Sequence, residues 1–192
     1  LLGAAQILKQ QEHSLNGVIK LIFQPGEEKI PGGASIMIRE GVLEDPIPEI
    51  ILGQHVNPAA PVGNASFVAG RMMASADELY WTVHGKSGHA AQPHLSVDPI
   101  VIAAHLVTQL QTIISRNLNP FEPGVLSVTS FHGGTVTNII PEAVEMMGTL
   151  RSMNLEWRED AIARIENYSR ILATTMGGSC DVNVWRGYPP LI

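Results

Sequence analysis

The stretch 77-DELYWTVHG-85 predicts a β-strand, and the segments after it complete one folding unit. A loop at 86–97 leads to Asp98 and Pro99. A capping side chain followed by proline in the first turn predicts the start of a helix. We expect that helix to continue to about Arg116. Its inward residues, taken at helical spacing, are predicted to be Ile100, Ala103, Val107, Leu110 and Ile114.

The following segments continue the same alternation of strands and helices. Strands are expected at about 124–132 and 142–151, then a helix at about 155–176, then a strand at about 179–186. The second helix is predicted to end at Gly177 and to turn inward Ile162, Ile165, Leu172 and Met176. The order β-α-β-β-α-β is the ferredoxin-like arrangement, in which two helices cover one face of a four-stranded antiparallel sheet.

The first third of the chain predicts a different kind of fold. The expected elements are a helix at 1–12, a strand at 17–23, a loop at 24–32, a helix at about 33–40 and a strand at 50–55. Gly41 is placed to be the residue just after the second helix. Strands that alternate with helices indicate an α/β fold with a parallel sheet covered on both faces.

These patterns divide the chain into parts. We expect a partial α/β domain at 1–72, a ferredoxin-like domain at 73–186 and the start of a return to the first domain at 187–192. The segment 61–75, rich in small residues, is the predicted connection. The chain opens inside an amphipathic pattern with no capping residue, which predicts that it is a piece of a longer protein.

Composition excludes several classes of function. The 192 residues are 45% hydrophobic and 16% charged, so a packed core is expected. The net charge is −6 without a Lys/Arg cluster, which argues against a nucleic-acid partner, and no apolar run has the length of a membrane span. The single cysteine, Cys180, rules out an internal disulfide and favours a cytoplasmic location.

Two adjacent carboxylates, Glu27 and Glu28, follow the predicted strand at 17–23. Open α/β sheets collect ligand sites at this edge, and a metal ion would relieve the repulsion between the two acids. One carboxylate would coordinate the metal, and the other would take a proton from water that the metal activates. The alternative is an exposed loop with two solvated acids, and the dipeptide alone favours that alternative.

His55 ends the strand predicted at 50–55, on the same rim as the two acids. A neutral imidazole is the commonest metal ligand, although a histidine at a strand end is more often an ordinary polar residue. Together the three residues supply two metal ligands and a base. A catalytic zinc-type site needs at least three protein ligands, so the predicted site is incomplete within this chain.

Two further loops contain candidate residues. In 88-GHAAQPH-94, small residues allow close approach of a ligand, and a histidine can donate a hydrogen bond to an oxyanion; the alternative is a loop with surface histidines. In 133-GGTVTNIIP-141 and 148-GTLR-151, Asn138 and Arg151 can together hold a carboxylate, the arginine by its planar fork. A hairpin with a surface arginine explains the same residues equally well.

The ordered set of motifs resembles one family. 21-LIFQPGEE-28, 53-GQH-55, 85-GKSGHAAQPH-94, 137-TNIIP-141 and 148-GTLR-151 together look like the M20 metallopeptidases, in the branch of the hippurate hydrolases and N-acyl-amino-acid amidohydrolases. The resemblance implies an α/β metallohydrolase domain with an inserted ferredoxin-like lid or dimerisation domain. It also implies amide hydrolysis of N-acyl amino acids at a centre of two divalent ions (Zn, Mn, Co or Ni).

The resemblance also implies residue roles and a partner. Glu27 matches the general base, Glu28 and His55 match metal ligands, and His89 matches the lid histidine that stabilises the oxyanion, often across a homodimer. Asn138 and Arg151 match positions that bind the substrate carboxylate. The family's Cys-Gly-His ligand segment and a later histidine are not in this chain. The alternative is therefore a dimerisation or binding module that is inactive because metal ligands are missing.

Overall fold

The computed structural model describes residues 1–28 and 32–191. Part of the loop predicted at 24–32, and the last residue of the return segment predicted at 187–192, lie outside the described residues. The chain divides into two compact units, Leu1–Ser66 (unit 1) and Phe67–Ile192 (unit 2), which we describe separately. Within the described residues, no helix combines the length and the apolar character of a membrane span.

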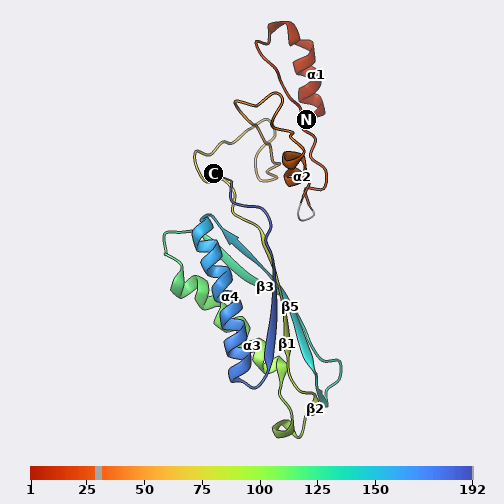
Figure 1. Ribbon diagram of the computed structural model, residues 1–192, viewed down its shortest axis with the longest axis vertical. Helices are drawn as coiled ribbons and strands as arrows, with labels where there is room; N and C mark the ends of the chain where they lie inside the picture. The colour runs from red at the N-terminus through yellow and green to blue at the C-terminus, as the bar shows by residue number, and fades with distance from the viewer. Residues whose placement is uncertain (29–31, 192) are drawn as a thin grey trace. The chain divides into compact units, whose positions relative to one another are not determined.

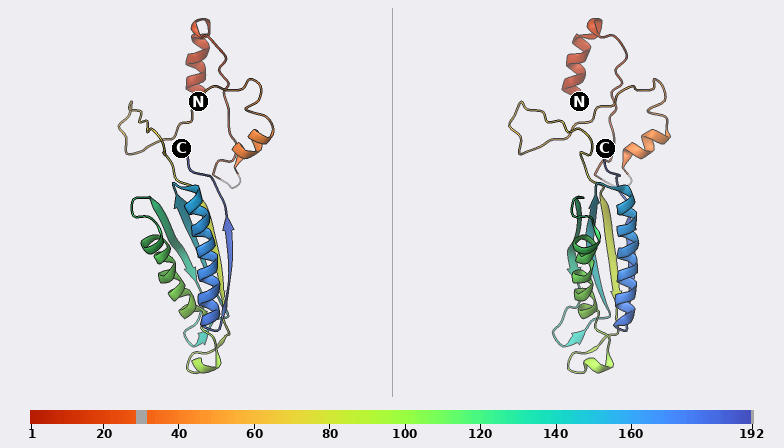
Figure 2. Two further views of the ribbon diagram at one scale, coloured as in Figure 1. Left: turned by 60° about the vertical axis from the view of Figure 1, so that its left-hand side comes forward. Right: turned by 90° about the vertical axis from the view of Figure 1, so that its left-hand side faces the viewer.

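The main sheet of unit 2 is four-stranded and antiparallel, with strand order β3-β5-β1-β6 (Figure 1). Its main elements in chain order are β1 (Asp77–His84), α3 (Pro99–Thr112), β3 (Gly124–His132), β5 (Ala143–Ser152), α4 (Leu155–Thr175) and β6 (Ser179–Trp185). Both long helices lie on the same face of the sheet (Figure 2). The predicted ferredoxin-like arrangement is therefore confirmed. We call the opposite face, which neither helix covers, the open face.

The core of unit 2 follows from the alternation of side chains along β1. Leu79, Trp81 and Val83 are buried beneath the helices, and the residues between them turn to the open face. The indole Nε1 of Trp81 donates a hydrogen bond of 3.1 Å to the hydroxyl of Ser169 on α4, so the polar atom of this large side chain is satisfied inside the core. This packing fixes which side chains the sheet presents on its open face.

The start of α3 is as predicted, but its inward face is not. Asp98 accepts hydrogen bonds from the backbone of Ile100 and Val101, with Pro99 in the first turn. Of the predicted set, Ala103 and Leu110 are fully buried, Val107 and Ile114 are only partly buried, and Ile100 is exposed. Ile102, Leu106 and Ile113 take the remaining fully buried positions. Because α3 is apolar on several sides, its spacing alone allows two faces, and the sheet selects between them.

The end of α3 and both ends of α4 are defined by local chemistry. α3 continues into one π-helical turn, η3 (Ile113–Asn117). α4 begins at Asn154, whose side chain caps the backbone of Glu156 and Trp157, and it stops before Gly177 at φ 86°. The prediction of the inward residues of α4 is confirmed. Ile162 and Ile165 are fully buried, and Leu172 and Met176 pack against the core.

One end of unit 2, which we call the tip, carries short elements inside the loop predicted at 86–97. They are β2 (Gly88–His89) and the 3-10 turn η2 (Pro93–Leu95), and β2 pairs with β4 (Ile139–Ile140). At the other end of the unit, the entering and leaving segments lie side by side. Met73 bridges to Leu191, and the backbone N–H of Ala76 donates to the carbonyl of Tyr188 at 3.0 Å.

Unit 1 contains helices but no strand among its described residues. They are α1 (Leu2–Gln10), the 3-10 turn η1 (Glu12–Ser14) and α2 (Gly33–Arg39). The helix predictions are confirmed, and Gly41 follows α2 with φ 82° as expected. The strands predicted at 17–23 and 50–55 are wrong, because neither segment pairs with another described segment. A strand needs a neighbour to satisfy its backbone groups, and an apolar sequence cannot supply one.

Candidate functional site

The acidic pair lies beyond a tight turn in unit 1. Gly26 in this turn has φ 59°, a conformation that glycine adopts readily, and Glu27 and Glu28 are both exposed. The turn packs closely on the start of α2, since a Cβ at Gly33 would come within 2.0 Å of the Pro25 carbonyl oxygen. The glycine in 32-GGA-34 therefore lets the chain that carries the acids lie against a helix end.

His55 lies in an exposed, extended segment of unit 1. Its Nδ1 lies 2.8 Å from the backbone carbonyl oxygen of Val56. A carbonyl only accepts, so this hydrogen bond requires the proton on Nδ1 and leaves the lone pair of Nε2 available. Such an arrangement suits a metal ligand, whose second ring nitrogen is normally held by a hydrogen bond.

His89 and Asn138 come together at the tip of unit 2. The ladder between β2 and β4 pairs His89 with Ile139, and the backbone N–H of Ala90 donates to the Asn138 carbonyl at 3.0 Å. The Nδ1 of His89 accepts a hydrogen bond of 3.1 Å from the backbone of Ala91. In the neutral imidazole the proton is then on Nε2, which can donate outward. The tip thus places an imidazole N–H on β2 close to the backbone of Asn138.

Arg151 lies far from the tip. It is near the end of β5, whereas β5 begins at Ala143, which pairs with His84 close to the tip. Arg151 follows Ala143 by eight positions, which corresponds to about 27 Å at the usual rise of an antiparallel strand. The structure therefore brings two of the three predicted lid residues together and separates the third from them within one chain.

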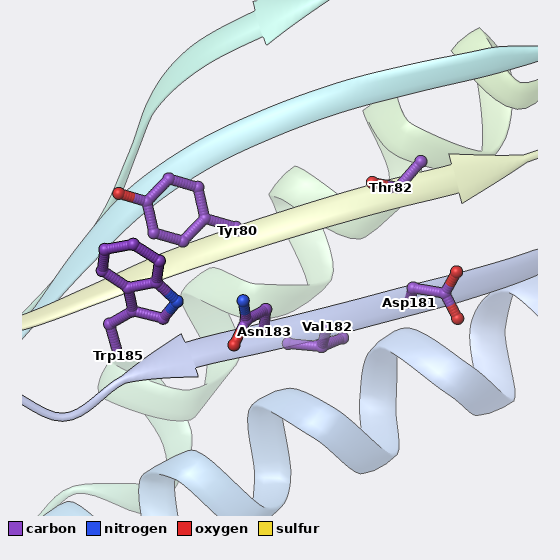
Figure 3. A pocket seen from close by; sticks show the side chains of 6 residues that line it. All are labelled: Tyr80, Thr82, Asp181, Val182, Asn183 and Trp185. Carbon is purple, nitrogen blue, oxygen red and sulfur yellow. The ribbon is translucent and has the colours of Figure 1, made fainter.

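The open face has a shallow hollow over β1 and β6 (Figure 3). Tyr80 and Trp185 lie beside each other there, with ring centroids 5.5 Å apart. The Tyr80 hydroxyl donates to the Glu78 carboxylate at 2.6 Å, and this hydrogen bond raises the pKa of Tyr80. None of the predicted site residues is among those lining the hollow, which are Tyr80, Thr82, Asp181, Val182, Asn183 and Trp185.

A buried ion pair was not predicted from the sequence. Asp77 is fully buried, and its carboxylate accepts hydrogen bonds from both Nε (2.8 Å) and Nη2 of Arg158 and from the backbone of Gly187 (3.1 Å). The hydrogen bond to Asp77 raises the pKa of Arg158. The burial of Asp77 could have been predicted from the sequence, because side chains alternate along a strand and Asp77 lies on the same face of β1 as Leu79 and Trp81.

Two other reactive side chains have surroundings that limit their chemistry. His84 faces Asp181 on the open face, with Nε2 and Oδ2 2.9 Å apart. Burial raises the pKa of the Cys180 thiol to about 12, and its Sγ lies 3.6 Å from the carbonyl oxygen of Asp181. A thiol with so high a pKa is a poor nucleophile.

The candidate metal ligands are of the right chemical type for a divalent ion, but there are too few of them. Carboxylate oxygen and imidazole nitrogen are both suitable donors. Within residues 1–28 and 32–191, however, no group of three or more His, Cys, Asp or Glu side chains is placed to hold a metal. Glu28 and His55 alone do not reach the three protein ligands of a catalytic centre, so the described residues do not form a complete metal site.

Residues 73–173 match the model of the peptidase dimerisation domain of the M20 family. The chain belongs to the M20 family. The match covers three strands of the sheet (β1, β3 and β5), all of α3 and most of α4, and it agrees with the ferredoxin-like topology of unit 2. The resemblance drawn from the sequence motifs is therefore confirmed.

M20 relatives with curated names match along the whole chain. An N-acyl-L-amino acid amidohydrolase of Geobacillus stearothermophilus is 38% identical over 100% of this chain and 51% of its own length. The N-acetyl-L-cysteine deacetylase of Bacillus subtilis is 37% identical over 100% of this chain and 45% of its own. The chain thus spans about half the length of these relatives.

Solved structures show the same M20 similarity. The Bacillus subtilis protein YXEP, described as a dinuclear metal binding M20 peptidase, is 30% identical with a TM-score of 0.73, over 98% of this chain and 46% of its own. A protein from methicillin resistant Staphylococcus aureus is 34% identical with a TM-score of 0.88, over 99% of this chain and 50% of its own. These similarities cover residues of both units.

Proposed function

We propose that the protein containing this chain hydrolyses the amide bond of N-acyl amino acids, including hippurate-like substrates. The observation that carries the proposal is the match along the whole chain to an amidohydrolase and a deacetylase of this chemistry. In this assignment residues 1–72 belong to the catalytic domain, 73–186 form the lid and 187–192 return to the catalytic domain. A cytoplasmic location is part of the proposal and rests on the single cysteine.

Two divalent ions, Zn, Mn, Co or Ni, would lower the pKa of the attacking water. Support comes from the neighbour described as a dinuclear metal binding peptidase. We assign Glu28 and His55 as two of the ligands, with further ligands from parts of the protein outside this chain. The imidazole of His55 suits this role because its Nδ1 is already held by a carbonyl.

The remaining residues of the proposed site act on protons and on the substrate. Glu27 takes the proton of the attacking water and passes it to the leaving amine. His89 donates from Nε2 to the developing oxyanion, a role supported by the hydrogen bond that Nδ1 accepts from Ala91. Asn138 and Arg151 bind the carboxylate of the amino acid, with the guanidinium supplying two parallel hydrogen bonds.

Two copies of the chain are part of this proposal. His89 and Asn138 lie at the tip, whereas Arg151 lies about 27 Å along β5, so one small substrate cannot touch both ends of the same lid. A homodimer solves this problem if one protomer supplies the tip and its partner supplies Arg151. The dimerisation-domain match supports such a pairing.

The direct test is Glu27→Gln in the full-length protein. The amide keeps the size of the side chain but cannot accept the proton, so kcat should fall by about 100-fold or more. Glu49→Gln is the matched control, since Glu49 is also an exposed acid of unit 1. A kcat of the Glu27 variant within a few-fold of wild type would show that Glu27 is not the base.

A further inference from the structure

Arg151 is restrained on one side only. Its Nη1 contacts the hydroxyl of Thr149 and also lies 3.2 Å from the carbonyl oxygen of Leu150 and 3.5 Å from that of Asp77. Thr149 and Arg151 are two residues apart on β5, so both side chains turn to the open face. The motif 148-GTLR-151 thus places a hydroxyl next to the guanidinium.

The direction of these hydrogen bonds is fixed by the threonine. The hydroxyl of Thr149 donates to the Asp77 carbonyl at 2.8 Å. A hydroxyl has a single hydrogen, so the side of Thr149 Oγ1 that faces Arg151 carries only lone pairs. Thr149 Oγ1 therefore accepts a hydrogen bond from Nη1 of Arg151. If the hydroxyl rotated its hydrogen toward Arg151, it would lose the hydrogen bond to the Asp77 carbonyl.

The carbonyl that anchors this arrangement belongs to a rigid residue. The side chain of Asp77 is held by Arg158 and by the backbone of Gly187, and the residue is fully buried. Asp77 also pairs with Leu150 in the ladder between β1 and β5. The backbone carbonyl of Asp77, which orients Thr149, is consequently fixed both by the strand pairing and by the buried side-chain interactions of the same residue.

The other edge of the guanidinium is available. Across the part of the chain that the structure describes, every hydrogen bond of Arg151 uses Nη1, and none uses Nε or Nη2. The Nε–Nη2 edge is one of the two that bind a carboxylate with parallel hydrogen bonds. A guanidinium already held at Nη1 loses less side-chain freedom when a ligand binds.

We propose that Thr149 is a positioning residue, which holds Arg151 so that its Nε–Nη2 edge faces a ligand carboxylate. The inference rests on the proposed function, in which Arg151 binds the carboxylate of the N-acyl amino acid. It adds a residue that touches no substrate atom and acts through Arg151. It also explains why a hydroxyl stands two residues before the arginine on the open face of β5.

The experiment uses the full-length protein, the N-acyl amino acid that it hydrolyses fastest, and the carboxamide of that substrate, which lacks the carboxylate. The readout is the ratio of kcat/KM for the two substrates. Thr149→Val should lower this ratio about tenfold, mainly by raising KM for the acid, because Arg151 loses the hydroxyl that orients it and keeps only the two carbonyl contacts. Thr149→Ser keeps the hydroxyl and should keep the ratio.

Thr82→Val is the matched control, the same substitution on the open face of β1 at a distance from Arg151. It should leave the ratio unchanged. An equal fall for both substrates in Thr149→Val, or no fall, would refute the positioning role. Arg151→Lys separates the two levels of the proposal. If it lowers the ratio and Thr149→Val does not, only the positioning role is wrong; if it does not lower the ratio, the carboxylate role of Arg151 fails as well.

Discussion

The first position of the motif 148-GTLR-151, Gly148, has no room for a side chain. A Cβ at this position would come within 2.3 Å of the Ser127 carbonyl oxygen and 3.1 Å of the Trp81 ring. Thr149 and Arg151 point to the other face of the sheet. One motif therefore combines a packing requirement on one side with a binding surface on the other.

Gly148→Ala should destabilise the protein by about 1–3 kcal/mol, because the added methyl group must push apart a strand and a buried indole. Urea unfolding followed by Trp fluorescence measures the change. Met147→Ala provides the comparison, since Met147 is an exposed neighbour on the same strand. Equal stabilities for the two variants would contradict the close contact.

Cys180 should be almost inert in the folded protein. Its pKa is raised to about 12, so the thiolate fraction at pH 8 falls by about 1000-fold relative to a thiol of pKa 9. Alkylation by iodoacetamide, located by peptide mapping, should be at least about 100-fold slower before unfolding in urea than after.

The rate for the folded protein should then increase with pH through the alkaline range, because the protonated form is the one that burial favours. Similar rates in the folded and unfolded states at pH 8 would contradict the raised pKa of the Cys180 thiol.

At the scale of elements, the start of α4 depends on one side chain. Asn154 accepts hydrogen bonds from the backbone of Glu156 (3.0 Å) and Trp157 (3.2 Å). Asn154→Ala should lower the free energy of unfolding by about 1 kcal/mol, whereas Asn154→Asp should keep most of the stability of wild type, because aspartate also caps a helix well. Chemical denaturation of the three proteins tests this, and an alanine variant as stable as wild type would show that the cap contributes nothing.

The elements of unit 2 were predictable because their signals are local. The cap at Asp98, the glycine after α4 and the alternation along β1 all appear within a few residues. The strands expected at 17–23 and 50–55 failed because strand formation depends on a partner elsewhere in the chain. Apolar runs show that a segment is suited to burial, but they do not show what it pairs with.

The sequence motifs supplied candidate residues such as Glu27, His55 and Arg151, whose roles stay predictions, but the motifs did not supply how these residues are arranged. The pairing of His89 with Asn138 depends on β2 and β4, which are only two residues each and give no periodic signal. The role of Thr149 required the hydrogen-bond directions around Asp77.

At the scale of the whole molecule, the proposed homodimer, in which two protomers contribute to one active site, can be tested by mixing inactive variants. Glu27→Gln and His89→Ala should each be inactive alone in the full-length protein. In a mixed dimer, one active site would combine the intact Glu27 of one protomer with the intact His89 of its partner. After random reassociation about a quarter of wild-type activity should return.

The control for this experiment is a mixture of Glu27→Gln with Glu27→Ala, which share the same defect and should remain inactive. Sedimentation of each variant must show the same oligomeric state as wild type. If the mixture of Glu27→Gln and His89→Ala recovers no activity although mixed dimers form, then both residues act from the same protomer, and the shared arrangement is wrong.

The adjacency of the entering and leaving segments of unit 2 has an evolutionary consequence. The backbone N–H of Met72 donates to the carbonyl oxygen of Leu191 at 2.9 Å, and the N–H of Leu191 donates to the carbonyl of Met73 at 2.9 Å, so the two ends of more than one hundred intervening residues are hydrogen-bonded to each other. A host chain could acquire or lose such a cassette at one peptide junction, with little change in the path of its own backbone. Recombination could then exchange this dimerisation domain without altering the rest of the host chain.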